Sequence, residues 1–259
     1  MSTTLYGAVL AEAYDALNDG IEYDKICDFL LSCVEKHSDI AVKEICEAAC
    51  GTGSMACELA RRGYTVTASD ISEDMLSAAD KKARENNLSV RFVLQDMRHS
   101  AMYSQKDLFL CLLDSMNYLL TKDDILSALE SARDCLKPGG LFIFDMNSKK
   151  KFETVYGNNA YVLETPDIYC GWENEYNEKT HICRFYLSIF RENANGTYTR
   201  ADEEQKERMY TVRQMKRYIE EAGFTLCAVY GDAVFSDGDE TRDERLYYVL
   251  KKEETHDER

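Results

Sequence analysis

The stretch Glu47-Ala48-Ala49-Cys50-Gly51-Thr52-Gly53 joins an apolar run at 41–46 to a helix-like run at 54–62. The first run predicts a strand and the second a helix, so both glycines fall at a strand-to-helix turn. Glycines at such a turn let a ligand approach the backbone, and the N–H groups of the first helical turn point toward that ligand. The stretch therefore predicts one wall of a ligand-binding crevice.

A carboxylate stands at the end of the next predicted strand, 64–70. Asp70 at that strand tip is placed to accept hydrogen bonds from ribose hydroxyls, so the turn and Asp70 together predict a ribose-containing cofactor. The segment Gly51-Thr52-Gly53-Ser54-Met55-Ala56 also satisfies the relaxed G-x-G-x-x-G/A dinucleotide pattern, with Asp70 at nearly the expected offset. These residues alone leave the identity of the cofactor open.

Helix-like and strand-like segments alternate outward from the turn. The pattern predicts strands at 41–49, 64–70, 90–96, 107–113 and 141–145, and helices at 22–37, 54–62, from Ser72 as N-cap, and at about 122–136. The last helix is expected to stop at Lys137-Pro138-Gly139-Gly140, a turn before the fifth strand. Continuous apolar strands alternating with helices are typical of a parallel sheet covered on both faces. The predicted class is α/β: a Rossmann-like, doubly wound, mostly parallel seven-stranded sheet.

The pattern changes after Asn147. Residues 152–210 are rich in aromatic and polar residues that alternate, and Asn195-Gly196 is a hairpin signal. They predict an antiparallel β insertion, a lid after the fifth strand. Thr211 is expected to cap a further helix, followed by strands at 224–230 and 245–250. The expected organisation is N-terminal helices and a cofactor-binding core at 1–151, the lid at 152–210, and the remainder of the core at 211–259.

Composition limits the function classes. The chain has 259 residues, 45% of them hydrophobic, and a formal net charge of −16. Because phosphate backbones are bound mainly by clustered Lys and Arg, we do not expect nucleic acid as a partner. The triplet Lys149-Lys150-Lys151 is interpreted as part of a solvated loop.

Ten cysteines occur without a C-x-x-C pair, and several lie in apolar runs, so we expect reduced thiols and no metal site. The opening residues Met1–Tyr6 lack the pattern of a secretory signal. No run approaches the roughly 20 apolar residues of a spanning helix. We expect a cytoplasmic protein without a membrane partner, present as a monomer or homodimer.

The order of these motifs resembles the class I S-adenosylmethionine-dependent methyltransferases over about residues 40–250. Matching segments are the glycine stretch 47–53, the acidic ribose clamp Asp70-Ile71, the adenine loop Gln95-Asp96-Met97, the fourth-strand motif at 113–118 and the turn at 136–140. Ser115-Met116-Asn117-Tyr118-Leu119 and Phe144-Asp145-Met146-Asn147 are similar to a small-molecule branch near the glycine and amino-sugar N-methyltransferases. Ala49 departs from the family, which usually has glycine there, and a small shift of the loop is expected.

The resemblance implies S-adenosyl-L-methionine as cofactor and in-line methyl transfer to a small-molecule acceptor, with nitrogen favoured over oxygen. The cofactor-binding residues that it implies are Tyr14, Tyr23, Glu47, Ala49, Cys50, Gly51, Gly53, Asp70, Ile71, Met75, Gln95, Asp96, Met97, Leu113, Asp114 and Asn117. Capping of the next turn is the alternative role for Asp96, and capping of the next helix for Asn117. An NAD-dependent oxidoreductase and a non-catalytic cofactor-binding partner protein are the alternative functions.

Candidates for the acceptor side come from the lid. His181 as a base, Arg208 as a partner of a substrate carboxylate, and Tyr210 are the catalytic candidates, with Trp172 as a further pocket residue. Each has a structural alternative. Aromatic residues in strands are more often core, a lone histidine at a strand start is usually on the surface, and Arg208 has Glu203, Glu204 and Glu207 as neighbours.

Overall fold

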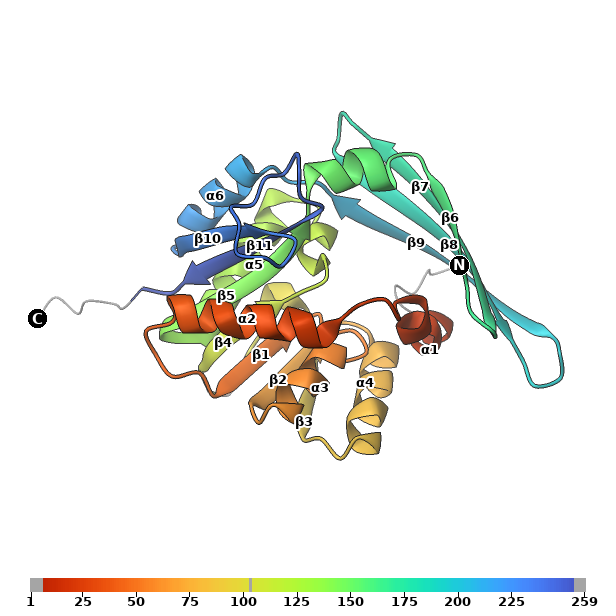
Figure 1. The fold of residues 1–259 in the computed structure, drawn as a ribbon, viewed down its shortest axis with the longest axis horizontal. Coiled ribbons are helices and arrows are strands. Elements are labelled where there is room, and N and C mark those ends of the chain that lie inside the picture. Colours follow the sequence, from red (N-terminus) through yellow and green to blue (C-terminus); the bar gives the residue numbers. More distant parts are fainter. Residues whose placement is uncertain (1–6, 103, 254–259) are drawn as a thin grey trace, which may run out of the picture.

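The computed structural model describes residues 7–102 and 104–253 and contains two β-sheets (Figure 1). The strands of the larger sheet are β1 (Glu44–Ala48), β2 (Thr65–Asp70), β3 (Val90–Leu94), β4 (Lys106–Cys111), β5 (Leu136–Asn147), β10 (Thr225–Gly231) and β11 (Arg245–Lys251). They form a seven-stranded sheet in the order β10-β11-β5-β4-β1-β2-β3. β1 to β5 run parallel, and β11 pairs antiparallel with both β5 and β10. The predicted α/β class is confirmed.

Helices cover both faces of this sheet. They are α2 (Tyr23–His37), α3 (Ser54–Arg61), α4 (Glu73–Glu85), α5 (Lys122–Cys135) and α6 (Val212–Glu221), with two short 3₁₀ turns, η1 (Met97–His99) and η2 (Ser115–Tyr118). α5 and α6 pack in one apolar cluster with alternate strand residues such as Cys46 and Phe142. α2 and α3 pack in a second cluster with the intervening residues, such as Ile45 and Ile143. The alternation of strand side chains thus divides the core into two layers.

The predicted insertion is a separate antiparallel sheet. Its strands are β6 (Ala160–Glu164), β7 (Ile168–Asn177), β8 (Ile182–Glu192) and β9 (Tyr198–Arg208), preceded by a π-helical turn η3 (Lys151–Tyr156). The Asn195-Gly196 hairpin signal is confirmed, since Gly196 lies between β8 and β9 with a φ of +78°. A helix without predicted bounds, α1 (Ala8–Leu17), packs between this sheet and α4 through Leu10, Met75 and Ile189 (Figure 1).

The predicted helix caps are observed. Ser72 accepts a hydrogen bond from the Met75 N–H at the start of α4, and Thr211 forms a capping box with Gln214 at the start of α6. The predicted helix stop is confirmed, since α5 ends at Cys135, but the separate turn predicted at 137–140 is wrong, because β5 already begins at Leu136. Its first residues pair with Lys106 across a register shift, and the Gly139 N–H donates to the Lys252 carbonyl. Proline and two glycines therefore form an irregular strand start rather than a loop.

Nine of the ten cysteines are buried as free thiols, and Cys227 is half-buried. In the described part of the chain, no helix has the length and apolar character needed to cross a membrane. The expectation for the opening residues Met1–Tyr6 lies outside the described residues.

Candidate functional site

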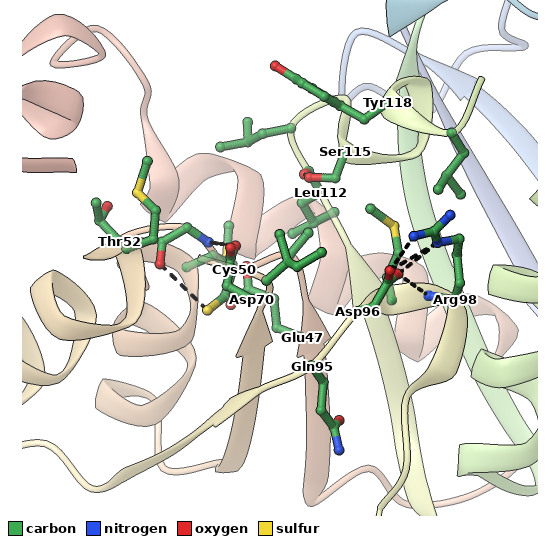
Figure 2. A pocket seen from close by; sticks show the side chains of 18 of the residues that line it. Glu47, Cys50, Thr52, Asp70, Gln95, Asp96, Arg98, Leu112, Ser115 and Tyr118 are labelled. Atoms are coloured by element: carbon green, nitrogen blue, oxygen red, sulfur yellow. Dashed lines mark hydrogen bonds and ion pairs between the residues drawn. The ribbon is translucent and has the colours of Figure 1, made fainter. Parts of the chain in front are cut away.

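A cavity of about 510 Å³ opens where β1, β2, β3 and β4 end (Figure 2). We call it the strand-end cavity. Carboxyl ends of parallel strands are the usual ligand site in open α/β sheets. Its lining residues are Tyr14, Tyr23, Glu47, Ala49, Cys50, Gly51, Thr52, Met55, Asp70, Ile71, Met75, Gln95, Asp96, Met97, Arg98, Leu112, Leu113, Ser115, Tyr118, Leu119, Leu120, Thr121 and Asp124.

The glycine turn is shaped by backbone conformation and by one carboxylate. Gly51 and Gly53 have φ values of +53° and +71°. The Asp70 carboxylate accepts the Gly51 N–H at 2.8 Å and the Ser72 N–H at 2.9 Å, which fixes the turn against the tip of β2. A Cβ on Gly53 would come within 2.9 Å of the Ala79 Cβ, so this glycine lets α3 pack on α4. Ala49 has a φ of +53°, a left-handed conformation that glycine adopts without strain.

Glu47 is the buried acid of the strand-end cavity. It is 3% exposed and accepts a backbone hydrogen bond from Ala56, while its Oε2 has no hydrogen-bond partner among the described residues. Burial raises the pKa of this carboxyl to about 8. A buried acceptor without a partner is costly, so a ligand that brings a donor or a positive charge would be stabilised here.

The loop after β3 differs in detail from the prediction. Asp96 is bound by the Arg98 guanidinium and accepts the Arg98 N–H at 2.9 Å (Figure 2). Arg98 Nη1 also donates to Asp124 at 2.7 Å. The capping alternative for Asp96 is therefore observed, although the residue still lines the cavity. The Gln95 amide points away from the other labelled side chains and donates to the Ala101 carbonyl at 3.0 Å, where it closes the loop.

The N-terminal segment covers the strand-end cavity with Tyr14 and Tyr23. A polar network ties α1 to the glycine turn: Thr52 Oγ1 donates to Asp15 at 2.6 Å, and Lys82 Nζ lies 2.7 Å from the other Asp15 oxygen. Burial raises the pKa of Tyr14 well above its usual range, so its phenol stays protonated.

A second cavity, of about 370 Å³, lies between the two sheets, and we call it the inter-sheet cavity. Tyr14, Leu113 and Tyr118 line both cavities. The two cavities are therefore neighbours, and these three side chains lie at their common boundary. Its remaining lining residues are Leu10, Leu17, Asn18, Ile21, Asp114, Lys151, Tyr156, Leu163, Cys170, Trp172, Phe185, Leu187, Gln205, Glu207 and Arg245.

An ion-pair network forms the core-side wall of the inter-sheet cavity. Arg245 on β11 pairs with Asp114 at 2.7 Å and with Asp145 on β5. The Asp145 carboxylate also accepts the N–H groups of Leu113 at 2.7 Å and Asp114 at 3.0 Å. Both of these residues are left-handed, with φ values of +54° and +58°. The network thus holds a strained turn after β4 in place.

Glu207 on β9 completes this wall. It accepts the Asn147 side-chain N–H at 3.0 Å and is hydrogen-bonded to Asp114. Burial, reinforced by the nearby Asp114 charge, raises the pKa of Glu207 well above its usual range. The opposite charge of Arg245 keeps the pKa of Asp114 below its ordinary value. Glu207 therefore carries the proton and Asp114 the negative charge.

Most predicted cofactor residues line the strand-end cavity, and three do not. Gly53 lies beneath the turn, where it packs on α4. Asp114 lines the inter-sheet cavity. Asn117 is fully buried, donates to the Arg208 carbonyl at 2.9 Å and accepts the Asn147 N–H at 2.9 Å, so it joins η2, β9 and β5.

The structure does not bring the predicted catalytic residues to either cavity. His181 lies in the turn between β7 and β8, beside the Tyr176 hydroxyl. Arg208 donates to the Leu120 carbonyl at 2.7 Å and stacks on Tyr210. Tyr210 is 3% exposed and donates to the Leu119 carbonyl at 2.6 Å, so its structural alternative is the one observed. Trp172 does line the inter-sheet cavity, as predicted for a pocket residue.

Other lining residues were missed by sequence reasoning. They include Thr52, Arg98 and Tyr118 at the strand-end cavity, and Lys151, Glu207 and Arg245 at the inter-sheet cavity. One signal was available: on β9 the alternate residues Glu203, Gln205 and Glu207 are buried, so polar side chains occupy the inward face. An inward row of polar side chains is costly unless a site uses it.

This fold and this strand-end cavity define a Rossmann-like protein that binds a nucleoside cofactor. Residues 45–140 match the family model described as a methyltransferase domain. A protein of Geobacillus sp. (strain WCH70), named as a methyltransferase without a stated substrate, is 30% identical over 92% of this chain and 96% of its own length. The chain belongs to the class I S-adenosylmethionine-dependent methyltransferases.

Solved structures agree with this assignment. An S-adenosylmethionine-dependent methyltransferase from Clostridium acetobutylicum ATCC 824 superimposes with a TM-score of 0.85 at 29% identity, covering 95% of this chain and 98% of that one. The sugar N-methyltransferase KedS8 from Streptoalloteichus sp. ATCC 53650 has the same fold, with a TM-score of 0.76 at 18% identity over 98% of each chain. The protein is an S-adenosylmethionine-dependent methyltransferase, and the dinucleotide alternative is set aside.

The residues of the strand-end cavity fit this cofactor. Glu47 Oε2 offers a buried acceptor for the ammonium group of the methionine portion. Asp70 at the tip of β2 and Asp96 after β3 also line the cavity, and their carboxylates are the groups that would face the ribose and adenine portions. Gly51 leaves room at the turn, since a Cβ built there meets no atom within 4 Å.

Proposed function

We propose that the enzyme methylates the nitrogen of a small amine bound in the inter-sheet cavity. The observation that carries the proposal is the shared lining of the two cavities by Tyr14, Leu113 and Tyr118. A donor in one cavity and an acceptor in the other would meet at these side chains. The inter-sheet cavity, at about 370 Å³, is near the lower end of the range for small-molecule sites.

The lining of the inter-sheet cavity favours an amine over a hydroxyl acceptor. An amine N–H can donate to the ionised Asp114 carboxylate, and the aromatic faces of Tyr14 and Trp172 suit a nitrogen centre that becomes cationic. A phenol or alcohol needs a base. Asp114 is a weak base because Arg245 lowers its pKa, and Glu207 already carries its proton because burial raises its pKa.

When bound, S-adenosylmethionine supplies a methyl group made electrophilic by the adjacent sulfonium. The task of the chain is then to hold the acceptor nitrogen in line, which can supply roughly 7–11 kcal/mol of the barrier in the best intramolecular models. Asp114 orients the nitrogen by accepting its N–H. Tyr14 and Tyr118 fix the boundary between the cavities, and α1 covers the junction and excludes water.

Named relatives support a nitrogen acceptor. Glycine/sarcosine N-methyltransferase of Parasynechococcus marenigrum (strain WH8102) is 24% identical over 79% of this chain. We further propose that residues 152–210 act as a lid, that the enzyme works in the cytoplasm as a monomer or homodimer, and that nucleic acid is not its substrate. The net charge of −16 supports the last point.

A product assay tests the proposal. The protein is incubated with S-adenosylmethionine and a panel of small amines and their hydroxyl counterparts, and the methylated products are identified by mass spectrometry. N-methylated products are expected, and products methylated only on oxygen, or no product from any amine, would overturn the proposal.

Asp114→Asn tests the orienting role. It should lower kcat/KM for the amine at least about tenfold, because a charged hydrogen bond is lost, while S-adenosylhomocysteine binding stays within threefold. Asp123→Asn, on the exposed first turn of α5, is the matched control and should change neither value.

A further inference from the structure

The lysine triplet at 149–151 does not behave as one solvated loop. Lys149 and Lys150 face Glu153 and Glu244, each at 3.8 Å, with 40% and 36% of their side chains exposed. Lys151 instead lines the inter-sheet cavity, and its ammonium lies 5.3 Å from the centre of the Tyr156 ring. The third lysine of the triplet is therefore part of the acceptor side of the enzyme.

Two cationic side chains line this cavity, and they differ in whether they form ion pairs. Arg245 is committed to Asp114 and Asp145. The Lys151 ammonium has no hydrogen bond or ion pair with any described residue, although the charges of Asp114 and Glu207 act on it from a distance. Burial, together with Arg245, lowers the pKa of Lys151. An ammonium in such surroundings is stabilised by an anion that comes into contact with it.

A second donor without a partner lies in the same cavity. The indole Nε1 of Trp172 is buried and has no hydrogen-bond partner among the described residues. Its ring lies 6.2 Å from the ring of Tyr156, the residue that also contacts Lys151. Both unpartnered donors are thus grouped around Tyr156, and both line the inter-sheet cavity.

We infer that Lys151 and Trp172 receive an anionic group of the methyl acceptor, so that the substrates are small amines that also carry a carboxylate or a phosphate. This inference rests on the proposed N-methyl transfer and names its substrate class. The two ends of the substrate then have separate partners: Asp114 accepts the amine N–H, and Lys151 and Trp172 donate to the anion. Apolar residues such as Leu187 and Phe185 also line the cavity and can contact a carbon skeleton.

Matched pairs of probes separate the anion from the amine. Glycine is compared with glycinamide, and phosphoethanolamine with ethanolamine, so that each pair keeps the amine and differs in the anion. Binding to the S-adenosylhomocysteine-loaded enzyme is measured by calorimetry, and turnover by product mass spectrometry. The anionic member of at least one pair should bind at least about tenfold more tightly than its neutral counterpart, and the pair that responds distinguishes carboxylate from phosphate.

Variants assign the preference to named residues. Lys151→Met should remove the preference for the anionic member, Trp172→Phe should weaken it a few-fold, and Lys151→Arg should retain most of it. Lys150→Met is the matched control, since it removes the same charge from the exposed neighbour and should leave the preference unchanged.

Each outcome has one meaning. Equal binding of both members of each pair, binding of neither member, or a preference that survives Lys151→Met overturns the inference. Unchanged binding but lost turnover in Lys151→Arg would make Lys151 a proton acceptor and also overturns it. Anion-dependent binding without any N-methylated product would instead overturn the proposed function and leave Lys151 as an anion site.

Discussion

The strand-end cavity and the inter-sheet cavity are built in different ways. The first is shaped by backbone turns at strand ends. Asp70 accepts the N–H of Ser72 two residues on and that of Gly51 on the turn after β1, and Asp96 accepts the N–H of Arg98 two residues on. The second is shaped by side chains from α1, η3, β7, β8, β9 and β11, which are far apart in the sequence. Its charges balance only through the contact of Arg245 with Asp114 and Asp145.

This difference separates donor binding from acceptor choice. Side chains that β7, β8, β9 and β11 contribute to the inter-sheet cavity can change without disturbing the glycine turn, because they lie on other elements. On the proposed assignment of the inter-sheet cavity to the acceptor, the four-stranded sheet would take different acceptors while the methyl donor is held in the same way. Substitutions at the strand-end cavity should therefore weaken binding of the methyl donor and spare the acceptor. Substitutions at the inter-sheet cavity should do the reverse.

The largest expected effect is that of Arg245→Met. It leaves Asp114 and Asp145 buried without a counter-charge, which should cost about 3–5 kcal/mol of unfolding free energy in urea titrations. Acceptor turnover should be lost while S-adenosylhomocysteine affinity of the folded protein stays within threefold. Lys251→Met, on the same strand but paired with the exposed Asp39, is the control and should cost less than about 1 kcal/mol.

If Arg245→Met does not fold, Arg245→Lys is used in its place. It keeps the charge but lacks the guanidinium that contacts both Asp114 and Asp145, so it should fold with weakened acceptor turnover. An equal loss of donor and acceptor binding in the folded variant would show that the two cavities are not independent.

Glu47→Gln should change how stability depends on pH. Because the pKa of Glu47 is raised to about 8 in the folded state, the native protein keeps a proton that the unfolded chain loses, and stability falls as the pH rises from about 4.5 to 8. Glu47→Gln removes this contribution. The free energy of unfolding of the variant minus that of wild type should therefore rise by about 3 kcal/mol from pH 5 to pH 7. Urea unfolding without cofactor at both pH values measures the difference.

Glu44→Gln makes the same chemical change at the partly exposed start of β1, and serves as the control. A pH dependence of Glu47→Gln that parallels wild type would show that Glu47 is not the group responsible.

Asp70→Asn tests the strand-end cavity alone. An amide cannot accept both the Gly51 and the Ser72 N–H, so the turn should loosen and the Kd of S-adenosylhomocysteine should rise at least about tenfold in calorimetry. The acceptor KM at saturating donor should change less than threefold. Glu73→Gln, at the next exposed acid, should leave both values unchanged, and a selective rise in acceptor KM for Asp70→Asn would contradict the separation.

Ala49→Gly should have the smallest effect and the opposite sign. Glycine relieves the left-handed backbone at φ +53°, and the gain should be about 0.5–1 kcal/mol, seen as a higher Tm. Ala60→Gly in α3, where the backbone is helical, should instead destabilise by roughly 1 kcal/mol. A loss of stability in Ala49→Gly would show that the methyl group contributes packing that outweighs the strain.

The parts of the molecule governed by local rules could be predicted from the sequence. The glycine turn, the Ser72 and Thr211 caps and the Asn195-Gly196 hairpin each depend on residues within a few positions, and each is observed. The position of Asp70 beside the cavity could be predicted because this residue ends a predicted strand. The four-stranded sheet could be predicted from the alternation of aromatic and polar residues, but its packing against α1 could not.

The acceptor side could not be predicted in the same way. Lys151, Glu207 and Arg245 come together only because β9 and β11 pass the end of β5, and no spacing in the sequence records that meeting. The predictions for His181, Arg208 and Tyr210 depend on residue type alone, and none of the three side chains lines either cavity. A histidine can serve a hairpin turn and a tyrosine can serve the core, because both uses satisfy the side chain without a ligand.

The position of Arg245 has a consequence for synthesis of the enzyme. β11 follows β10 in the chain and is inserted between β10 and β5, so the guanidinium can reach Asp114 and Asp145 only after the chain has been synthesised through residue 245. A nascent chain that stops short of residue 245 therefore lacks the cation that pairs with both carboxylates in the wall of the inter-sheet cavity.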